Sequence, residues 1–147
     1  MPQSLANVVL HLVFSTKNRR PVLTDDISGE AHRYLTGVLT NIGCGPLQED
    51  GAADHIHLLF RQSRTRSIAE VVEAVKTGSS KWLKSKGCPD FAWQNGYGIF
   101  SVGSELQQVA DYVRNQREHH TKMSFQDELR QMLRDAGVEY DERYLWD

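Results

Sequence analysis

The chain has 147 residues, of which 39% are hydrophobic and 24% are charged, with a formal net charge of -2. This composition excludes a low-complexity or disordered chain and suits a single globular domain over residues 1–147. No apolar run is long enough to span a bilayer, and no export signal precedes the first strand. Because Cys44 and Cys88 form no metal-binding spacing, we expect a cytoplasmic protein with reduced thiols.

The net charge hides an uneven distribution along the chain. Residues 121–147 contain seven acidic and four basic side chains, so the remainder is slightly basic. Its basic residues form local clusters that can contact phosphates. They can equally complement helix dipoles or keep the surface soluble. The candidate phosphate-binding residues are Lys17, Arg19, Arg20, Arg61, Lys76, Lys81 and Lys84.

The first third of the chain predicts a strand followed by a helix. Asn7–Ser15 is nearly continuously apolar, as expected of a central strand covered on both faces. We interpret its one histidine, His11, as a core residue and leave it out of the candidate site. Thr24 then offers an N-cap, apolar residues follow at spacings of three and four, and Gly43 ends the helix.

Residues 44–60 predict a β-hairpin with a turn at Asp50-Gly51. In its second arm, side chains alternate between the two faces of the sheet. His55 and His57 therefore share one face, and Ile56, Leu58 and Phe60 share the other. The two histidine Cα atoms lie ~6.6 Å apart at about 3.3 Å per residue, so both rings can reach one divalent ion. We expect the apolar residues to lie beneath helices and the histidines to line an open cleft.

The second half of the chain completes the element order. Ser67 caps a second helix, residues 97–102 form a strand, a third helix runs from Glu105 to about His120, and Ser124 caps a fourth. The order predicts an α+β, ferredoxin-like βαββαβ fold: a four-stranded antiparallel sheet with helices on one face. Residues from about 121 to 147 add a C-terminal helical extension. The histidine-containing strand would be internal.

The third helix can bring two further polar groups to the histidines. Tyr112 and Gln116 are spaced i and i+4, so their side chains are neighbours on one flank of the helix. A phenol and a carboxamide oxygen could then face a cleft beside the sheet. Alternatively, Tyr112 is a boundary residue half in the core. His119 and His120 could bind a metal ion or phosphate, but we expect them to end this helix as solvated side chains.

These motifs together carry a family resemblance. His55–His57 (HIH), followed by Tyr112–Gln116 (YVRNQ), resembles the single-tyrosine HUH endonucleases, specifically the insertion-sequence-200-like transposases. The similarity extends over nearly the whole chain, and the order and spacing of the motifs make it specific. Further similar stretches are Leu12–Arg20, Asp54–Leu59, Trp93–Tyr97, Phe100–Val102 and Asn115–His120.

The resemblance implies a nuclease and strand transferase that acts on single-stranded or hairpin DNA at element ends. It implies Tyr112 as the nucleophile that becomes joined to a 5′-phosphate, and His55, His57 and Gln116 as ligands of Mg²⁺ or Mn²⁺. It also implies a homodimer, in which the tyrosine helix of one subunit can complete the histidine pair of the other. The basic residues named above would then contact DNA.

Two other functions fit parts of the same sequence. A domesticated relative could keep the fold as a DNA-binding or regulatory protein without transposition. A zinc hydrolase is less favoured, because the His-x-His pair with a carboxamide lacks an obvious fourth ligand and general base.

Overall fold

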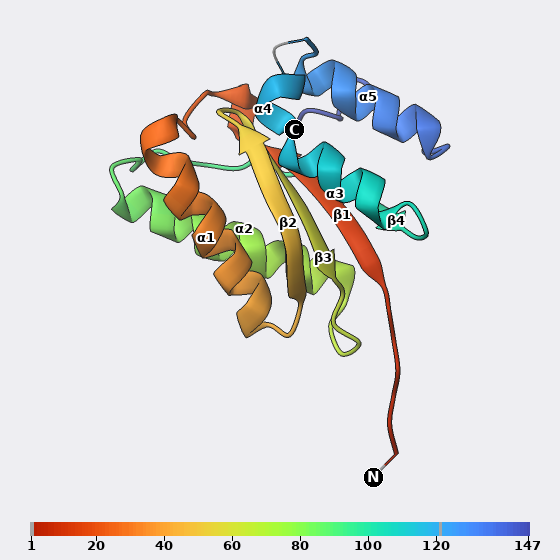
Figure 1. The fold of residues 1–147 in the computed structure, drawn as a ribbon. Helices are drawn as coiled ribbons and strands as arrows, with labels where there is room; N and C mark the ends of the chain where they lie inside the picture. The colour runs from red at the N-terminus through yellow and green to blue at the C-terminus, as the bar shows by residue number, and fades with distance from the viewer. Residues whose placement is uncertain (1, 121) are drawn as a thin grey trace.

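Four strands form one antiparallel sheet in this computed structural model, which describes residues 2–120 and 122–147. The strand order is β2-β3-β1-β4, so the histidine-containing strand β3 is internal, as predicted (Figure 1). With two helices connecting the strands, this is the predicted βαββαβ arrangement. The strands are β1 (Val9–Ser15), β2 (Gly45–Ala52), β3 (His55–Arg61) and β4 (Gly98–Val102).

One face of the sheet carries the main hydrophobic core. Helices α1 (Asp25–Asn41) and α2 (Ile68–Ser85) cover this face (Figure 1). Ile56, Leu58 and Phe60 are completely buried there, as the strand alternation predicts. They lie opposite the apolar residues of β1, with Leu58 paired to Leu12, so the register fixes which side chains of β3 enter the core.

Local sequence explains where α2 begins and how it packs. The Ser67 hydroxyl accepts a hydrogen bond from the Glu70 amide, and the Glu70 carboxylate accepts one from the Ser67 amide, which forms a complete capping box. Further along, a Cβ at Gly78 would lie 3.3 Å from the side chain of Val38, so glycine allows α1 to approach closely. In the described residues, no helix is long and apolar enough to cross a membrane.

The predicted turn at Asp50-Gly51 is wrong. Strand β2 continues to Ala52, Gly51 pairs with Ile56, and the chain reverses at residues 53–54. A Cβ at Gly51 would lie only 2.2 Å from the carbonyl oxygen of His55. This glycine is therefore present because two backbones approach closely, and the Asp-Gly pair does not form the turn.

The C-terminal third of the chain covers the opposite face of the sheet. The elements are α3 (Leu106–Arg114), α4 (Gln116–His119) and α5 (Phe125–Asp135) (Figure 1). The single helix predicted for residues 105–120 is instead broken at Asn115, whose φ of -101° and ψ of 26° leave the helical region. The predicted open cleft is also wrong, because these helices bury the histidine face.

The close approach at Gly51 generates a stability prediction. In Gly51→Ala the new methyl group overlaps the carbonyl of His55, so the free energy of unfolding should fall by about 2–3 kcal/mol. Gly37→Ala is the matched control, because this exposed position in α1 has nothing within 4 Å of the added Cβ. It should raise the free energy of unfolding by ~0.5–1 kcal/mol. Urea unfolding measures both, and an unchanged Gly51→Ala midpoint would contradict the account.

Candidate active site

His55 is oriented by its neighbour in the turn. The His55 Nδ1–H donates to the Asp54 carboxylate at 2.7 Å, which leaves Nε2 as the free nitrogen. This Nε2 lies 3.4 Å from Gln116 Oε1 and 3.6 Å from Glu128 Oε1. A carboxylate behind a histidine fixes the ring and makes the other nitrogen a better ligand. His55 is therefore arranged as a metal-ligating histidine is.

His57 is the middle member of a hydrogen-bonded row. Its Nε2–H donates to Glu128 Oε1 at 2.9 Å, and its Nδ1 accepts from His11 Nε2 at 2.8 Å. Burial, partly offset by Glu128, lowers the pKa of His57 to about 4. Burial, together with the charge that His57 carries when protonated, lowers the pKa of His11 to about 3. Both rings are therefore neutral at pH 7, as metal binding by His57 requires.

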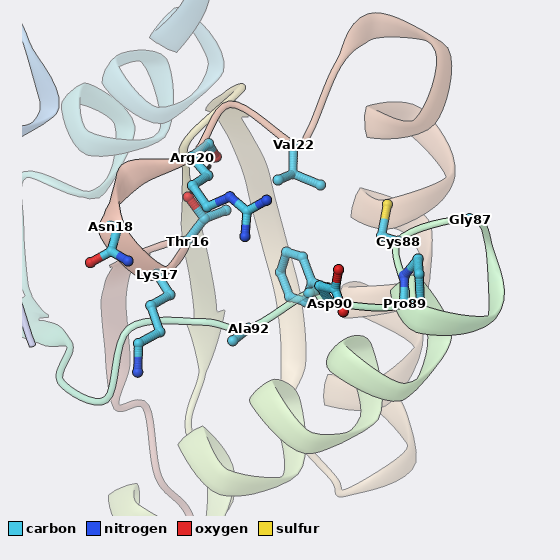
Figure 2. Close-up of a pocket in the computed structure, with 11 residues that line it drawn as sticks. Thr16, Lys17, Asn18, Arg20, Val22, Gly87, Cys88, Pro89, Asp90 and Ala92 are labelled. Carbon is cyan, nitrogen blue, oxygen red and sulfur yellow. Dashed lines mark hydrogen bonds between the residues drawn. The ribbon is translucent and has the colours of Figure 1, made fainter.

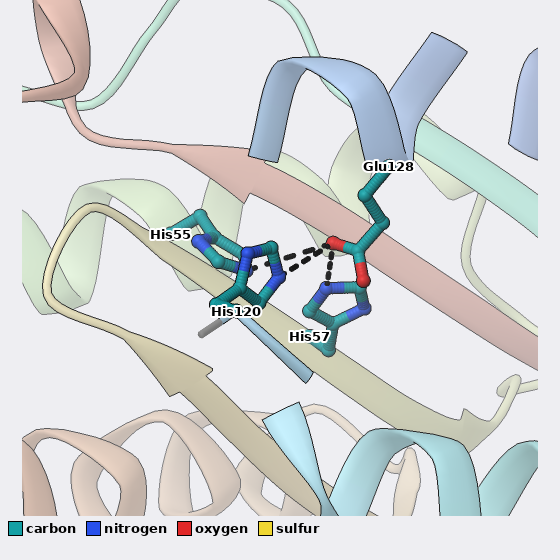
Figure 3. Close-up of side chains that lie close together, drawn as sticks. All are labelled: His55, His57, His120 and Glu128. Carbon is teal, nitrogen blue, oxygen red and sulfur yellow. Dashed lines mark hydrogen bonds and ion pairs between the residues drawn. The ribbon is translucent and has the colours of Figure 1, made fainter. Parts of the chain in front are cut away.

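Glu128 of α5 joins the separate parts of the site. Its carboxylate is 1% exposed, and Oε1 accepts from His57 and from His120, the latter at 3.0 Å (Figure 3). Its Oε2 accepts from the hydroxyl of Tyr112. Burial alone would raise the pKa of Glu128, but the hydrogen bonds from His120 and His57 outweigh it and hold that pKa far below its usual range. Glu128 is thus a buried anion.

Gln116 and His120 come from the short helix α4 and its C-terminal end. Gln116 is completely buried, and its amide nitrogen donates to the Tyr112 carbonyl, which turns Oε1 toward the histidines. His120 Nε2 lies 2.9 Å from this oxygen. Burial alone would lower the pKa of His120, but its hydrogen bond to Glu128 outweighs this effect and raises it. Because the side chain of His120 is only 9% exposed, the expectation that this residue is solvated is wrong.

Tyr112 lies beside the histidines, on α3. Its ring centroid is 6.0 Å from that of His57, and its hydroxyl lies 3.4 Å from His119 Nε2. Burial, and secondly the hydrogen bond to Glu128, raise the pKa of this phenol above its ordinary value. The resting site therefore holds Tyr112 protonated. The structure brings Tyr112, His55, His57 and Gln116 together within one chain.

The donor set suits a divalent cation. One nitrogen or oxygen each from His55, His57, His120 and Glu128 lies within 4.8 Å of the others, and Gln116 Oε1 points to the same place. Imidazole nitrogens and carboxyl or amide oxygens are the ligands that manganese and related metals accept. His55 Nε2 also faces two oxygen atoms, an arrangement that a cation between them would stabilise. The residues present fit a metal ion.

Two of the site residues are absent from the ligand set that the family resemblance implies. His120 follows a break in the helix, and Glu128 lies twelve residues beyond the YVRNQ motif. One signal for Glu128 is present in the sequence. The buried side chains Phe125, Leu129 and Leu133 form the apolar stripe of α5, and Glu128 lies on this stripe. An acid on the apolar face of an amphipathic helix predicts a buried partner.

The two pockets that candidate phosphate-binding residues line contain none of the clustered histidines. Lys17 and Arg20 line a pocket of about 310 Å³ between the end of β1 and the loop after α2 (Figure 2). Lys81 and Lys84 line a groove beside residues 91–95. Arg19 lies over the ring of Trp146, 5.6 Å from its centroid, and Arg61 is exposed at the end of β3. Their contact with DNA stays a prediction.

The ammonium group of Lys76 is hydrogen-bonded to backbone carbonyls and is therefore not free to bind a phosphate. Its ammonium group donates to the carbonyls of Gln94 at 2.8 Å, Asn95 at 3.2 Å and Gly96 at 2.7 Å. Burial lowers its pKa to about 8. Lys76 therefore fixes the aromatic loop after α2. Of that loop, Phe91 and Trp93 are buried and Tyr97 is 41% exposed.

Comparison with known proteins identifies the family. The model of the family described as "Transposase IS200 like" matches residues 4–116. The chain belongs to the IS200-like transposases. They are DNA-processing enzymes. The match ends at Gln116, so His120 and Glu128 lie outside the part of the chain that the family model describes.

Individual relatives agree with this assignment. The chain is 28% identical over 123 residues to the transposase for insertion sequence element IS200 of Salmonella typhimurium, which covers 76% of this chain and 78% of the relative. It is 24% identical over 116 residues to the ISDra2 transposase TnpA of Deinococcus radiodurans, covering 74% and 83% respectively.

Solved structures show the same fold. A Deinococcus radiodurans protein described as a transposase superposes with a TM-score of 0.65 at 23% identity, covering 79% of this chain and 95% of that one. A REP-associated tyrosine transposase bound to a REP hairpin superposes with a TM-score of 0.62 at 11% identity, covering 82% and 72%.

The buried histidines generate a pH prediction. The pKa values of His11 and His57 are lower in the folded chain than the ordinary 6.5, so between about pH 6.5 and pH 4 the unfolded chain binds more protons. Stability should therefore fall as the pH falls through this window. His120, whose pKa is raised, acts in the opposite sense above about pH 6.5.

Thermal unfolding across this window measures the effect. In His11→Asn one of the two titrating groups is removed, so the melting temperature should fall less steeply with pH than in the wild type. An equal slope in both proteins would contradict the assignment of His11 as a neutral buried histidine.

Proposed function

We propose that this chain is a metal-dependent single-stranded DNA endonuclease and strand transferase that works in transposition through a 5′-phosphotyrosine intermediate. One observation carries the proposal. The hydroxyl of Tyr112 shares a single carboxylate with His57 and His120, so the nucleophile lies beside the converging donor atoms within one chain. Membership in the IS200-like family supports the same reaction.

Tyr112 is the proposed nucleophile. Its phenolic oxygen forms a bond to the scissile phosphorus, and the bond from phosphorus to the 3′-oxygen breaks. The proton lost by the phenol balances the proton gained by the 3′-oxygen, so no water is consumed. Because one phosphodiester replaces another, a second strand's 3′-hydroxyl can reverse the step and join the strands without nucleotide hydrolysis.

His55, His57 and Gln116 are the proposed ligands of Mg²⁺ or Mn²⁺. When bound, the cation would orient the phosphate and stabilise negative charge on the leaving oxygen. Asp54 holds the ring of His55 for this purpose, and His11 does so for His57. Histidine nitrogens favour manganese over magnesium in this ligand set.

Single-stranded or hairpin DNA at element ends is the proposed substrate. The structural relative bound to a REP hairpin supports a hairpin ligand, and the basic residues on the surface supply contacts to phosphates. A homodimer is proposed from the family resemblance. Because Tyr112 lies beside the histidines of its own chain, a single subunit holds all the proposed catalytic and metal-binding side chains.

A DNA-binding or regulatory protein without transposition is the second candidate. The complete burial of His55, His57 and Gln116 favours it, because an idle site has no need to open. The two candidates differ in one result, the formation of a covalent adduct.

Tyr112→Phe tests the nucleophile. The change removes one oxygen atom, so it should abolish cleavage and the covalent protein–DNA adduct while leaving DNA affinity within about twofold of the wild type. Tyr97→Phe, at an exposed tyrosine outside the site, is the matched control and should keep full activity. Gel electrophoresis with labelled single-stranded flanks measures the adduct. Cleavage by Tyr112→Phe with release of free 5′-phosphate would instead indicate a metal hydrolase.

Asp54→Asn tests the metal site. The loss of the carboxylate behind His55 should weaken Mn²⁺ binding by about 10- to 100-fold, while His57→Ala should abolish measurable binding. Isothermal titration of Mn²⁺ into the protein reports both effects without any DNA. Unchanged Mn²⁺ affinity in both variants would rule out this set of ligands.

A further inference from the structure

The carboxylate of Glu128 lies where two sides of the site meet. One of its oxygens accepts from His57 and His120, and the other accepts from the Tyr112 hydroxyl. A scissile phosphodiester is also an anion with two free oxygens, and it must touch the same two sides, the donor cluster and the nucleophile. Two anions cannot occupy this position at once.

We propose that Glu128 is an internal mimic of the scissile phosphate, and that α5 keeps the site closed until single-stranded DNA displaces it. This inference rests on the proposed function and adds to it how access to the site is regulated. The displacing ligand is a phosphodiester backbone, which takes the place of the carboxylate beside Tyr112.

The burial of the site requires such a displacement. His55, His57 and Gln116 are completely buried and Glu128 is 1% exposed, so a DNA backbone cannot reach these groups while α5 is in place. Within the described residues, α5 is no part of the sheet, so its displacement breaks none of the strand pairings.

Aromatic and apolar contacts hold α5 on the sheet, and a backbone hydrogen bond holds the segment after it. Phe125 stacks on His55 with ring centroids 4.6 Å apart, and Leu129 and Leu133 pack on Val13 of the sheet. The C-terminal end is tied to the aromatic loop, where the Gly96 amide donates to the Asp147 carbonyl at 2.8 Å. This second hydrophobic cluster is separate from the main core, so it can open as a unit while the rest stays folded.

The closed arrangement is also chemically unreactive. The hydroxyl of Tyr112 donates to the carboxylate of Glu128, so in the closed arrangement it is engaged by that anion and not by a phosphate. Release of Glu128 removes the acceptor that holds the hydroxyl and frees the position for the phosphate. Opening therefore frees the hydroxyl and the phosphate position together.

Glu128→Gln separates this role from a catalytic one. The side chain keeps its shape but loses the charge that accepts three hydrogen bonds, so the open fraction should rise. The apparent Kd for a fluorescein-labelled, mixed-sequence single-stranded oligonucleotide, measured by anisotropy in EDTA, should fall by at least about tenfold. Asp135→Asn removes one exposed charge from the same helix and should change this Kd by no more than about twofold.

Equal Kd values for Glu128→Gln and Asp135→Asn would overturn the proposal. So would the loss of Mn²⁺ binding in Glu128→Gln, measured by titration without DNA, because that result would make Glu128 a metal ligand. If Glu128→Gln does not fold, hydrogen exchange on the wild type decides. The oligonucleotide should speed amide exchange in residues 125–135, and slower exchange there would contradict displacement.

This test is independent of the proposed reaction. Binding in EDTA requires no cleavage, so tight binding by Glu128→Gln with no adduct in any protein would contradict the proposed function and leave the displacement intact. An adduct in the wild type with unchanged binding in Glu128→Gln would do the reverse.

Discussion

The buried carboxylate of Glu128 is the interaction on which the arrangement of this site depends. An ionised carboxylate in a protein interior is very costly unless donors surround it. Here His57, His120 and Tyr112 supply those donors from three different elements. These donors keep the pKa of Glu128 low. The resulting anion in turn raises the pKa of Tyr112 and holds α5 against the sheet. Removing the carboxylate would leave these three donors without their shared acceptor.

The sheet makes this arrangement possible because its two faces differ in chemistry. Side chains of β1 and β3 alternate, so Leu12 and Leu58 enter the main core while His11 and His57 face the C-terminal helices. A slip of one residue in the register would exchange these sets. The apolar face thus stabilises the fold and also fixes which side chains of β1 and β3 face the C-terminal helices.

Much of this could be predicted from the sequence because it rests on local periodicity. The alternation in β3, the capping box at Ser67 and the order of elements are short-range signals, and the structure confirms the fold that they indicate. The Asp50-Gly51 turn was mispredicted because the same dipeptide also suits a strand whose glycine admits a close backbone. The break at Asn115 likewise reflects packing that a single helix pattern does not reveal.

The site itself was predictable only in part. Tyr112, Gln116 and the histidine pair follow from motif spacing, and the structure places them together. The role of Glu128 and the burial of the site depend on the contact between His57 and Glu128, which lie 71 positions apart. No local sequence pattern encodes such a contact. The only sequence signal we find for this contact is the position of Glu128, an acidic residue on the apolar stripe of α5.

A crystal structure with Mn²⁺ and a single-stranded oligonucleotide bound to Tyr112→Phe would test the central claim most directly. The account predicts an ion in contact with His55 and His57, a phosphate in the position that Glu128 holds here, and α5 moved away from the sheet. A bound strand with Glu128 still hydrogen-bonded to His57 and His120 would contradict it.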